Sequence, residues 1–287
     1  GRKGEGPGEF TVVYNLFVTD RGLVAFDTRQ DRFSLFSMDR PYDFISTHTL
    51  SSPEGYYPAG PVGRSGSRFL VNYSKPFREV DRNGVNLGPD AHLAWVDSAG
   101  ENVKDSVLMV PGIQVLMRQE GTKRMYANMP FARGPRFAGG RIGSIYYGRT
   151  DSLRIGRYSP TGEHLSTVRF PYDYVPVSEA ELDSLMSDRS DWSREMLLSS
   201  DAVSTRPAFD EIVTDDQGHL LIDVTGEPSD DTTPWKIVDF DEQTVREAVL
   251  PENVSIETIR DGKVYGVHTD EYGVDEVVVY QITSVSA

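Results

Sequence analysis

The chain has 287 residues, of which 38% are hydrophobic and 10% aromatic, and its formal net charge is −15. This composition can supply a substantial core, but no apolar run approaches the roughly 20 residues that cross a bilayer as a helix. The acidic balance argues against general nucleic-acid binding, and the absence of cysteine excludes disulfides, thiolate metal sites and cysteine nucleophiles.

The first predicted element is a turn over residues 1–10, GRKGEGPGEF, which contains four glycines and one proline. A Walker loop needs Gly-Lys followed by Ser or Thr, and a dinucleotide-binding loop lies between a strand and a helix. Here the Gly-Pro-Gly sequence leads into an extended, β-rich segment. The pattern therefore predicts a turn between two β units, and not a phosphate site.

Five β units follow along the chain. A strand, an acidic or glycine-containing turn and a second strand occur at residues 16–27, 211–223 and 257–268. A later strand marks each unit, at residues 32–39, 92–100, 153–162, 235–243 and 276–282. One residue of each strand marks the spacing, which is 60, 62, 82 and 40 positions between successive members of the set Phe36, Val96, Tyr158, Phe240 and Tyr280. This uneven spacing favours a β-propeller with loop insertions over a rigid solenoid.

One amphipathic helix is predicted at about residues 178–198, in the longest interval between units. Ser178 and Glu181 form a capping box. Apolar side chains follow at helical spacing and are expected to pack on their own domain: Leu182, Leu185, Met186, Trp192 and Met196. No linker divides the chain. Residues 1–287 are therefore predicted to form a single β-propeller domain, with an acidic inter-blade insertion at 171–207.

Charge is distributed unevenly along the sequence. The net charge is +5 over residues 1–170, −15 over 171–242 and −5 over 243–287. Residues 121–150 contain six basic side chains and no acidic one. Two interpretations remain open. These are either solvated loop residues, or a basic docking surface opposite an acidic one that steers a charged partner. Only the second interpretation predicts that they cluster in space.

Two Gly/Pro-rich segments, residues 51–69 and 129–141, place aromatic side chains beside arginines. Both are predicted to be loops, and this composition is typical of interface anchors. The alternative is that these side chains fold back onto the ring. The candidate protein-binding residues, with one arginine from the neighbouring basic stretch, are Tyr56, Tyr57, Arg124, Phe131, Arg133, Arg136, Phe137 and Arg141.

No residue pattern indicates a catalytic, cofactor-binding or metal-binding role. The five histidines lack metal-ligand spacing, acidic turns such as Asp215-Asp216 lack the alternating calcium-loop pattern, and no G-x-S-x-G elbow occurs. His164 and His219 each follow a glycine turn and precede an apolar strand. They are interpreted as repeat-position residues, and not as ligands.

The segment GRKGEGPGEF, together with LFVTDRGLVAFDTRQDRFSLF and PAFDEIVTDDQGHLLI, resembles bacterial six-bladed β-propeller proteins of the NHL-like type. In that family a G-x-GPGEF segment closes one blade and leads into the next. The resemblance implies an all-β six-bladed propeller with five visible units and a sixth unit before Gly1. It also implies an exported protein, periplasmic or extracellular, which a preceding segment could attach to a membrane.

The sequence favours a non-enzymatic scaffold that binds a protein partner and needs no cofactor. The expected context is an accessory subunit of a membrane-bound respiratory or photosynthetic complex. The alternative is a calcium-dependent, lactonase-like hydrolase or lyase, because some six-bladed propellers hold calcium on the central axis through carboxylates and an Asn from different blades. Fold alone does not decide between them. Convergence of three or four such side chains on the axis would distinguish them.

Overall fold

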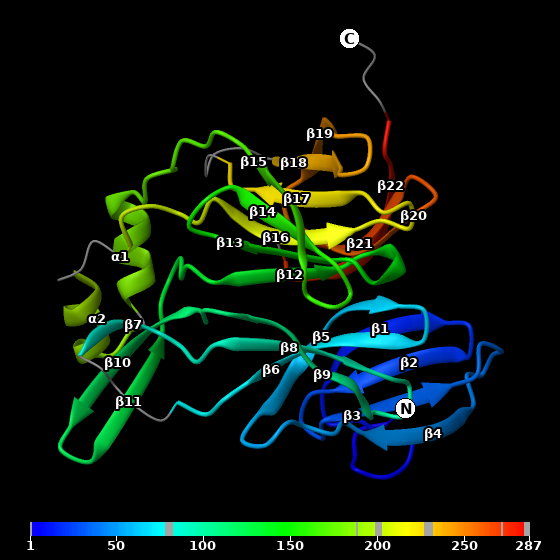
Figure 1. Cartoon of the computed structure of the whole chain (residues 1–287). Helices are drawn as coiled ribbons and strands as arrows, with labels where there is room; N and C mark the ends of the chain where they lie inside the picture. Colours follow the sequence, from blue (N-terminus) through cyan, green and yellow to red (C-terminus); the bar gives the residue numbers. More distant parts are fainter. Residues whose placement is uncertain are drawn as a thin grey trace.

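The computed structural model describes residues 2–77, 83–187, 189–198, 203–226, 232–270 and 272–283, without the side chains of 103–105 and 141. The fold is an all-β propeller with six sheets of three or four strands and two short helices (Figure 1). Five sheets are successive blades, and the sixth is an accessory sheet beside them. The predicted fold class, with five β units and a helical insertion, is confirmed.

The first two blades each contain four antiparallel strands. The first blade consists of β1 (Val13–Thr19), β2 (Gly22–Asp27), β3 (Arg32–Phe36) and β4 (Phe44–Thr49). The second blade consists of β5 (Tyr57–Ser65), β6 (Arg68–Ser74), β8 (Ala91–Val96) and β9 (Asn102–Val110). In both blades the strand order follows the chain from the inner edge outwards.

The next two blades repeat this plan, and the fifth has three strands. The third blade consists of β12 (Pro135–Gly139), β13 (Ile145–Arg149), β14 (Arg154–Tyr158) and β15 (His164–Arg169), with the 3₁₀ turn η1 (Arg141–Gly143) after β12. The fourth consists of β16 (Phe209–Thr214), β17 (Leu220–Val224), β18 (Thr232–Asp239) and β19 (Thr244–Pro251). The fifth consists of β20 (Val254–Arg260), β21 (Lys263–Thr269) and β22 (Asp275–Gln281).

The core is divided into layers, one between each pair of neighbouring blades. Phe26 and Phe33 of the first blade pack against Phe69 of the second, and the Phe33 and Phe69 ring centroids are 4.5 Å apart. Separate clusters join the second blade to the third, the third to the fourth and the fourth to the fifth. Alternating side chains on each strand supply both faces of a blade. Both faces of the central strands β2, β3 and β17 are therefore largely buried, and these strands read as short, mostly apolar runs bounded by turns.

The inner strands have an unusual composition for β structure. The inner strands β5, β12, β16 and β20 follow one another around the axis, and each contacts the next. The strands β5 and β12 contain Pro58, Pro61 and Pro135. An inner strand has a ladder partner on one side only, so proline is tolerated there. Residues 51–69 and 129–141, predicted to be loops, therefore each contain an inner strand, and that prediction was wrong.

The accessory sheet is built from residues inserted into the second blade and residues that follow it. It consists of β7 (Gly84–Leu87), β10 (Gln114–Glu120) and β11 (Lys123–Asn128), in the order β11-β10-β7. The helices α1 (Glu179–Ser187) and α2 (Asp191–Leu198) lie beside it (Figure 1). Leu116 of the sheet, Met186 of α1 and Leu197 of α2 share one buried cluster. We call these elements the accessory module.

The predicted single helix is two helices. The Ser178 hydroxyl accepts a hydrogen bond from the Glu181 N–H at 3.2 Å, so the serine half of the predicted capping box is present at the start of α1. The Glu181 carboxylate pairs with Arg206 instead of closing the box. Ser190 begins α2, where its carbonyl accepts hydrogen bonds from the N–H groups of Ser193 and Arg194. Serine at a cap competes with helix continuation. The predicted apolar stripe packs in the accessory module, as expected for a structural stripe.

The opening segment folds as a turn over the first blade. The Glu9 N–H donates to the Gly6 carbonyl at 3.1 Å, and Gly8 has a φ of 73°, as expected for a Pro-Gly turn of type II. The buried Arg32 guanidinium donates to the carbonyls of Glu5, Gly6 and Glu9. A phosphate cradle would present N–H groups. This segment presents carbonyls to a cation, so the prediction of a structural turn is confirmed.

Candidate functional site

A β-bulge in β16 turns two carboxylates out of the blade. The register pairs Phe209 with Val224 and then Ile212 with Ile222, so Asp210 and Glu211 stand opposite the single residue Asp223. An extra residue in one strand re-aims side chains and bends the strand. The side chains of Asp210 and Glu211 are consequently exposed, although both neighbours in the strand, Phe209 and Ile212, are buried.

The inner strand of the fifth blade has the same irregularity. In β20 the register pairs Ile256 with Gly266 and then Thr258 with Tyr265, which leaves Glu257 as the extra residue. β16 and β20 lie next to each other. The carboxylate of Glu257 therefore approaches Glu211 closely enough to perturb its ionisation. We call Asp210, Glu211, Asp223 and Glu257 the axial acidic cluster.

Burial raises the pKa values of three members of the axial acidic cluster, Asp210, Glu211 and Asp223, and neighbouring carboxylates add to the shift of the last two. Burial, followed by the charges of Asp210 and Glu211, raises the pKa of Asp223 from 3.8 to about 7. Burial and the Glu257 carboxylate raise the pKa of Glu211. Burial also raises the pKa of Asp210, although three arginines oppose this shift. Asp210 and Glu211 reach solvent, but the surrounding blades restrict their hydration.

The three arginines that act on Asp210 are Arg133, Arg136 and Arg206, which we call the arginine group. Arg136 lies on β12 and its Nε donates to the Asp210 backbone carbonyl. Arg133 follows the accessory sheet and donates to the Thr205 carbonyl at 2.9 Å and to the Thr205 hydroxyl at 2.7 Å. The segment that carries Thr205 leads out of the accessory module into the fourth blade.

Aromatic rings and one carboxylate hold the arginine group in place. The Arg133 guanidinium lies 5.9 Å from the Tyr174 ring centroid, and that of Arg206 lies 5.3 Å from the Phe131 ring centroid. Arg206 also forms an ion pair with Glu181 of α1. Burial lowers the pKa of Arg133 below its usual value, but an arginine remains charged at physiological pH. The site therefore has a cationic side next to an anionic side.

The axial acidic cluster has oxygen donors, which suit a calcium ion. Within the described ranges, however, no three His, Cys, Asp or Glu side chains are disposed to hold a metal ion. The carboxylates come from the fourth and fifth blades, while the corresponding inner strand of the third blade contributes the cation Arg136. A cation beside the carboxylates opposes the binding of a further cation at this position.

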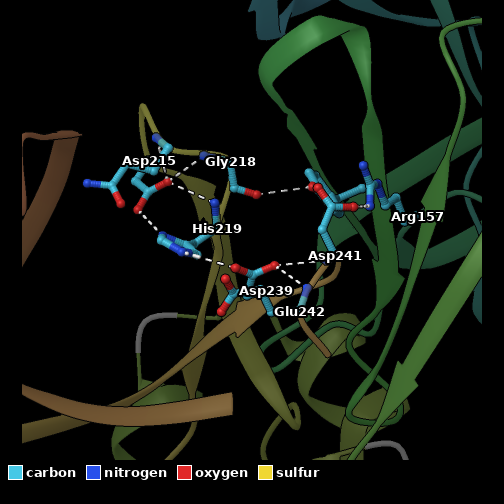
Figure 2. Close-up of polar contacts among 9 residues, drawn as sticks. Arg157, Asp215, Gly218, His219, Asp239, Asp241 and Glu242 are labelled. Atoms are coloured by element: carbon cyan, nitrogen blue, oxygen red, sulfur yellow. Dashed lines mark hydrogen bonds and ion pairs between the residues drawn. The ribbon is translucent and has the colours of Figure 1, made fainter. Parts of the chain in front are cut away.

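A second polar cluster lies at the turns of the fourth blade (Figure 2). His219 Nδ1 is 2.6 Å from an Asp215 carboxylate oxygen, and His219 Nε2 is 3.5 Å from one of Asp239. Asp215 already accepts the N–H groups of Gln217, Gly218 and His219, while Asp239 accepts those of Asp241 and Glu242. The histidine thus joins two hydrogen-bonded turns.

This second cluster also contacts the third blade. Arg157 of β14 forms an ion pair with Asp241 at 2.5 Å (Figure 2). The Tyr146 hydroxyl donates to the Gly218 carbonyl at 3.4 Å. The carboxylates of Asp215, Asp239 and Asp241 therefore each have a structural partner within the chain. This agrees with the interpretation of His219 as a repeat-position residue. The other such residue, His164, is exposed and contacts the Thr167 hydroxyl.

We call the axial acidic cluster and the arginine group, with the rings that hold the arginines, the axial site. The structure brings three of the sequence candidates to it and separates the others. Phe131, Arg133 and Arg136 lie there, as described above. Tyr56 is half-buried, with its ring 4.8 Å from that of His92, and Phe137 stacks on Tyr147 at 5.6 Å between blades.

The remaining three candidates lie apart from the axial site. Tyr57, at the start of β5, is 44% exposed. Arg124 lies on β11 of the accessory sheet, and the side chain of Arg141 lies outside the described residues. A role of the eight candidates in protein binding stays a prediction.

Sequence reasoning did not single out the axial acidic cluster. The adjacent Asp210-Glu211 pair, set in the apolar strand AFDEIV, is the one local signal, since two polar residues in succession break the period of two. Glu257 interrupts its strand in the same way. The strands β16 and β20 are neighbours only because of the order of the blades. A motif within a single segment of the sequence cannot reveal that relationship.

No known protein family and no curated protein sequence matches this chain. Solved structures with a similar fold do exist. A putative exported protein from Bacteroides fragilis has 13% identity and a TM-score of 0.43, with 94% of this chain and 70% of that chain covered. Virginiamycin B lyase from Staphylococcus aureus has 10% identity and a TM-score of 0.37, with 95% and 85% covered.

A third similar structure is regucalcin, a calcium-binding protein from Agrobacterium tumefaciens, with 13% identity and a TM-score of 0.32, covering 92% of this chain and 85% of that one. These neighbours are β-propellers, and at such identities the likeness concerns the fold alone. The sheets and strand order described above make this protein an all-β propeller. In the described part of the chain no helix has the length and apolarity needed to cross a membrane.

Proposed function

We propose that this protein is an exported, non-catalytic propeller that binds a protein partner at the axial site. The observation that carries the proposal is the division of charge there. The axial acidic cluster belongs to the fourth and fifth blades, and the arginine group lies beside it. A partner segment with a cationic and an anionic group in sequence would match both sides.

The carboxylates of the axial acidic cluster are available for such a partner. None of the ion pairs among the described residues includes them. Arg136, the nearest cation in the third blade, gives its Nε hydrogen bond to a backbone carbonyl. Like charges in a partly dehydrated site destabilise the fold. A lysine, an arginine or a terminal ammonium of the partner would relieve that repulsion.

The arginine group supplies the complementary half of the surface. Arg133 and Arg206 are held by neighbouring rings and hydrogen bonds, so few side-chain rotamers remain to be lost on binding. Interface energy commonly concentrates in such preorganised arginines and aromatic rings. This makes Phe131, Arg133 and Arg136, three of the predicted protein-binding residues, part of the proposed surface. That the partner is a respiratory or photosynthetic membrane complex stays a prediction.

Affinity purification of the tagged full chain from its native cells tests the proposal. We expect one protein to be captured specifically with the wild type and lost with the double variant Glu211→Gln and Glu257→Gln. The matched control is Glu163→Gln with Glu242→Gln, which removes two exposed carboxylates from turns of the third and fourth blades. Equal capture by all three proteins would contradict binding at the axial site.

The alternative function, a calcium-dependent hydrolase or lyase, is favoured by one observation, the position of Asp210, Glu211 and Glu257 on inner strands of adjacent blades. Calorimetric titration of the full chain with calcium chloride separates the two functions. Saturable binding that Glu211→Gln and Glu257→Gln abolish would favour the enzyme. The proposed binding function predicts no saturable calcium uptake at this site.

A further inference from the structure

The fifth blade has three strands, in the order β20-β21-β22, whereas each of the other four blades has four. In those four blades an outer strand pairs antiparallel with the third strand. Among the described residues, β22 has a partner on its inner side only. Its outer edge therefore presents backbone donors and acceptors that no described residue pairs with.

The edge of β22 lacks the usual protection against further pairing. Natural edge strands carry lysine, proline or a bulge that blocks association. The strand β22 reads DEVVVYQ and pairs with β21 in an unbroken register, so it has no lysine, proline or bulge, and its charged side chains are confined to Asp275 and Glu276 at its start. Val277 and Val279 are 82% and 54% exposed. Such a strand is a template for an additional strand.

A groove of roughly 460 Å³ lies beside this edge, between the fourth and fifth blades. Its walls include Trp235, Ala248 and Leu250 of the fourth blade and Tyr280 and Ile282 of the fifth. The volume is within the range of ligand-binding clefts. Ala248 and Leu250 are only partly covered by the fifth blade. A fourth strand next to β22 would place alternate side chains in this groove, which we call the rim groove.

We propose that β22 and the rim groove bind an extended peptide segment of another protein by β-strand addition. The segment has apolar side chains at alternate positions, facing the groove, and a basic flank. The basic flank follows from charge: residues 243–287 have a net charge of −5, and β22 itself begins with the exposed pair Asp275 and Glu276. This site is on the rim and does not depend on the axial site.

The hydrogen-bond pattern identifies the backbone groups that would bind the segment. The Ile282 N–H donates to the Gly262 carbonyl at 2.8 Å, so it points towards β21. Successive residues of an antiparallel strand direct their backbone groups to opposite sides. The N–H groups of Val277, Val279 and Gln281 therefore point to the free edge. The side chains of Val277 and Val279 lie on the solvent face, away from the groove.

Two variants test the edge of β22 and the rim groove independently. Val279→Pro removes one edge donor while leaving the ladder with β21 in place, and proline is tolerated at an edge. Ala248→Trp fills the rim groove, which has room for an indole. The matched control is Leu165→Lys, which changes an exposed side chain on β15, the outer strand of the complete third blade.

The probe is a fluorescein-labelled synthetic peptide, Lys-Lys-Val-Thr-Ile-Thr-Val-Thr, measured by fluorescence anisotropy against the full chain. We expect saturable binding by the wild type and by Leu165→Lys, binding weakened at least about tenfold by Val279→Pro, which is about 1.4 kcal/mol, and none by Ala248→Trp. Circular dichroism confirms that each variant is folded.

Three results would overturn the proposal. The first is the absence of peptide binding, and the second is equal binding by Val279→Pro and by the wild type. The third is a wild-type dimer in sedimentation velocity that Ala248→Trp converts to a monomer, because a second copy would then occupy the edge. Binding at the axial site is measured with a different ligand and different variants, so either proposal can fail alone.

Discussion

Gly63 of β5 and Gly139 of β12 face each other where the second and third blades meet on the inner side. A Cβ atom on Gly63 would lie 2.3 Å from both the Cα and the backbone nitrogen of Gly139. Neither backbone can yield easily, because each strand is held in its own blade. The two inner strands can therefore approach as they do only because both positions lack a side chain.

Gly63→Ala should destabilise the protein by about 2 kcal/mol, since the added methyl forces the two inner strands apart. Urea unfolding followed by circular dichroism measures the change. The matched control is Gly121→Asn in the turn between β10 and β11. A Cβ there meets nothing within 4 Å and the φ of 60° is one that asparagine tolerates. Equal stability of Gly63→Ala and wild type would show that the blades can separate without penalty.

Gly63 and Gly139 also show which parts of the fold can be predicted from the sequence and which cannot. The central strands β2, β3 and β17 are buried on both faces, so they read as short, mostly apolar runs between turns, and that pattern identifies them. In β5 and β12 the inner position demands glycine and permits proline. A strand under those two constraints has the composition of a loop, and local pattern alone cannot separate the two.

The axial site could not be predicted from the sequence, for a different reason. Glu211 and Glu257 belong to strands 46 positions apart, and a bulge in each strand turns their carboxylates to the same side. A bulge depends on the partner strand, which local pattern does not specify. The Asp210-Glu211 pair could have suggested an irregular strand, but its neighbours on the axis follow only from the order of the blades.

Arg32→Lys should loosen the opening segment and lower stability by about 2 kcal/mol. The Arg32 guanidinium donates to three carbonyls of residues 5–9, and a lysine ammonium cannot reproduce this planar arrangement. Hydrogen exchange should accelerate at the amides of residues 4–10. Arg68→Lys, an exposed position at the start of β6, is the control and should leave both quantities unchanged. Unaltered exchange in Arg32→Lys would show that the turn is held by other contacts.

Leu197→Ala should destabilise the accessory module by about 3 kcal/mol, because Leu197 is fully buried between α2 and the accessory sheet and its removal leaves a cavity. Differential scanning calorimetry measures the loss. The adjacent Leu198 is 61% exposed, so Leu198→Ala is a control of identical chemistry. If the two variants unfold at the same temperature, the helices do not contribute to the cooperative unit.

Asp223→Asn should change how stability depends on pH. The pKa of Asp223 is raised from 3.8 to about 7, so between these values the folded state holds a proton that the unfolded state has released. Stability therefore falls as pH rises from about 4 to about 7, and is constant above that range as far as this group is concerned. An asparagine carries no charge, so the variant should lose this decline.

The variant should consequently be the more stable protein at pH 8, by roughly 2 kcal/mol, less than the full shift implies because nearby solvent screens the charge. Urea unfolding at pH 5 and pH 8 gives the two differences. Asp183→Asn, an exposed carboxylate on α1, should retain the wild-type slope. A wild-type slope in Asp223→Asn would mean that the axial carboxylates are hydrated as in free solution, and the repulsion that the partner is proposed to relieve would then be absent.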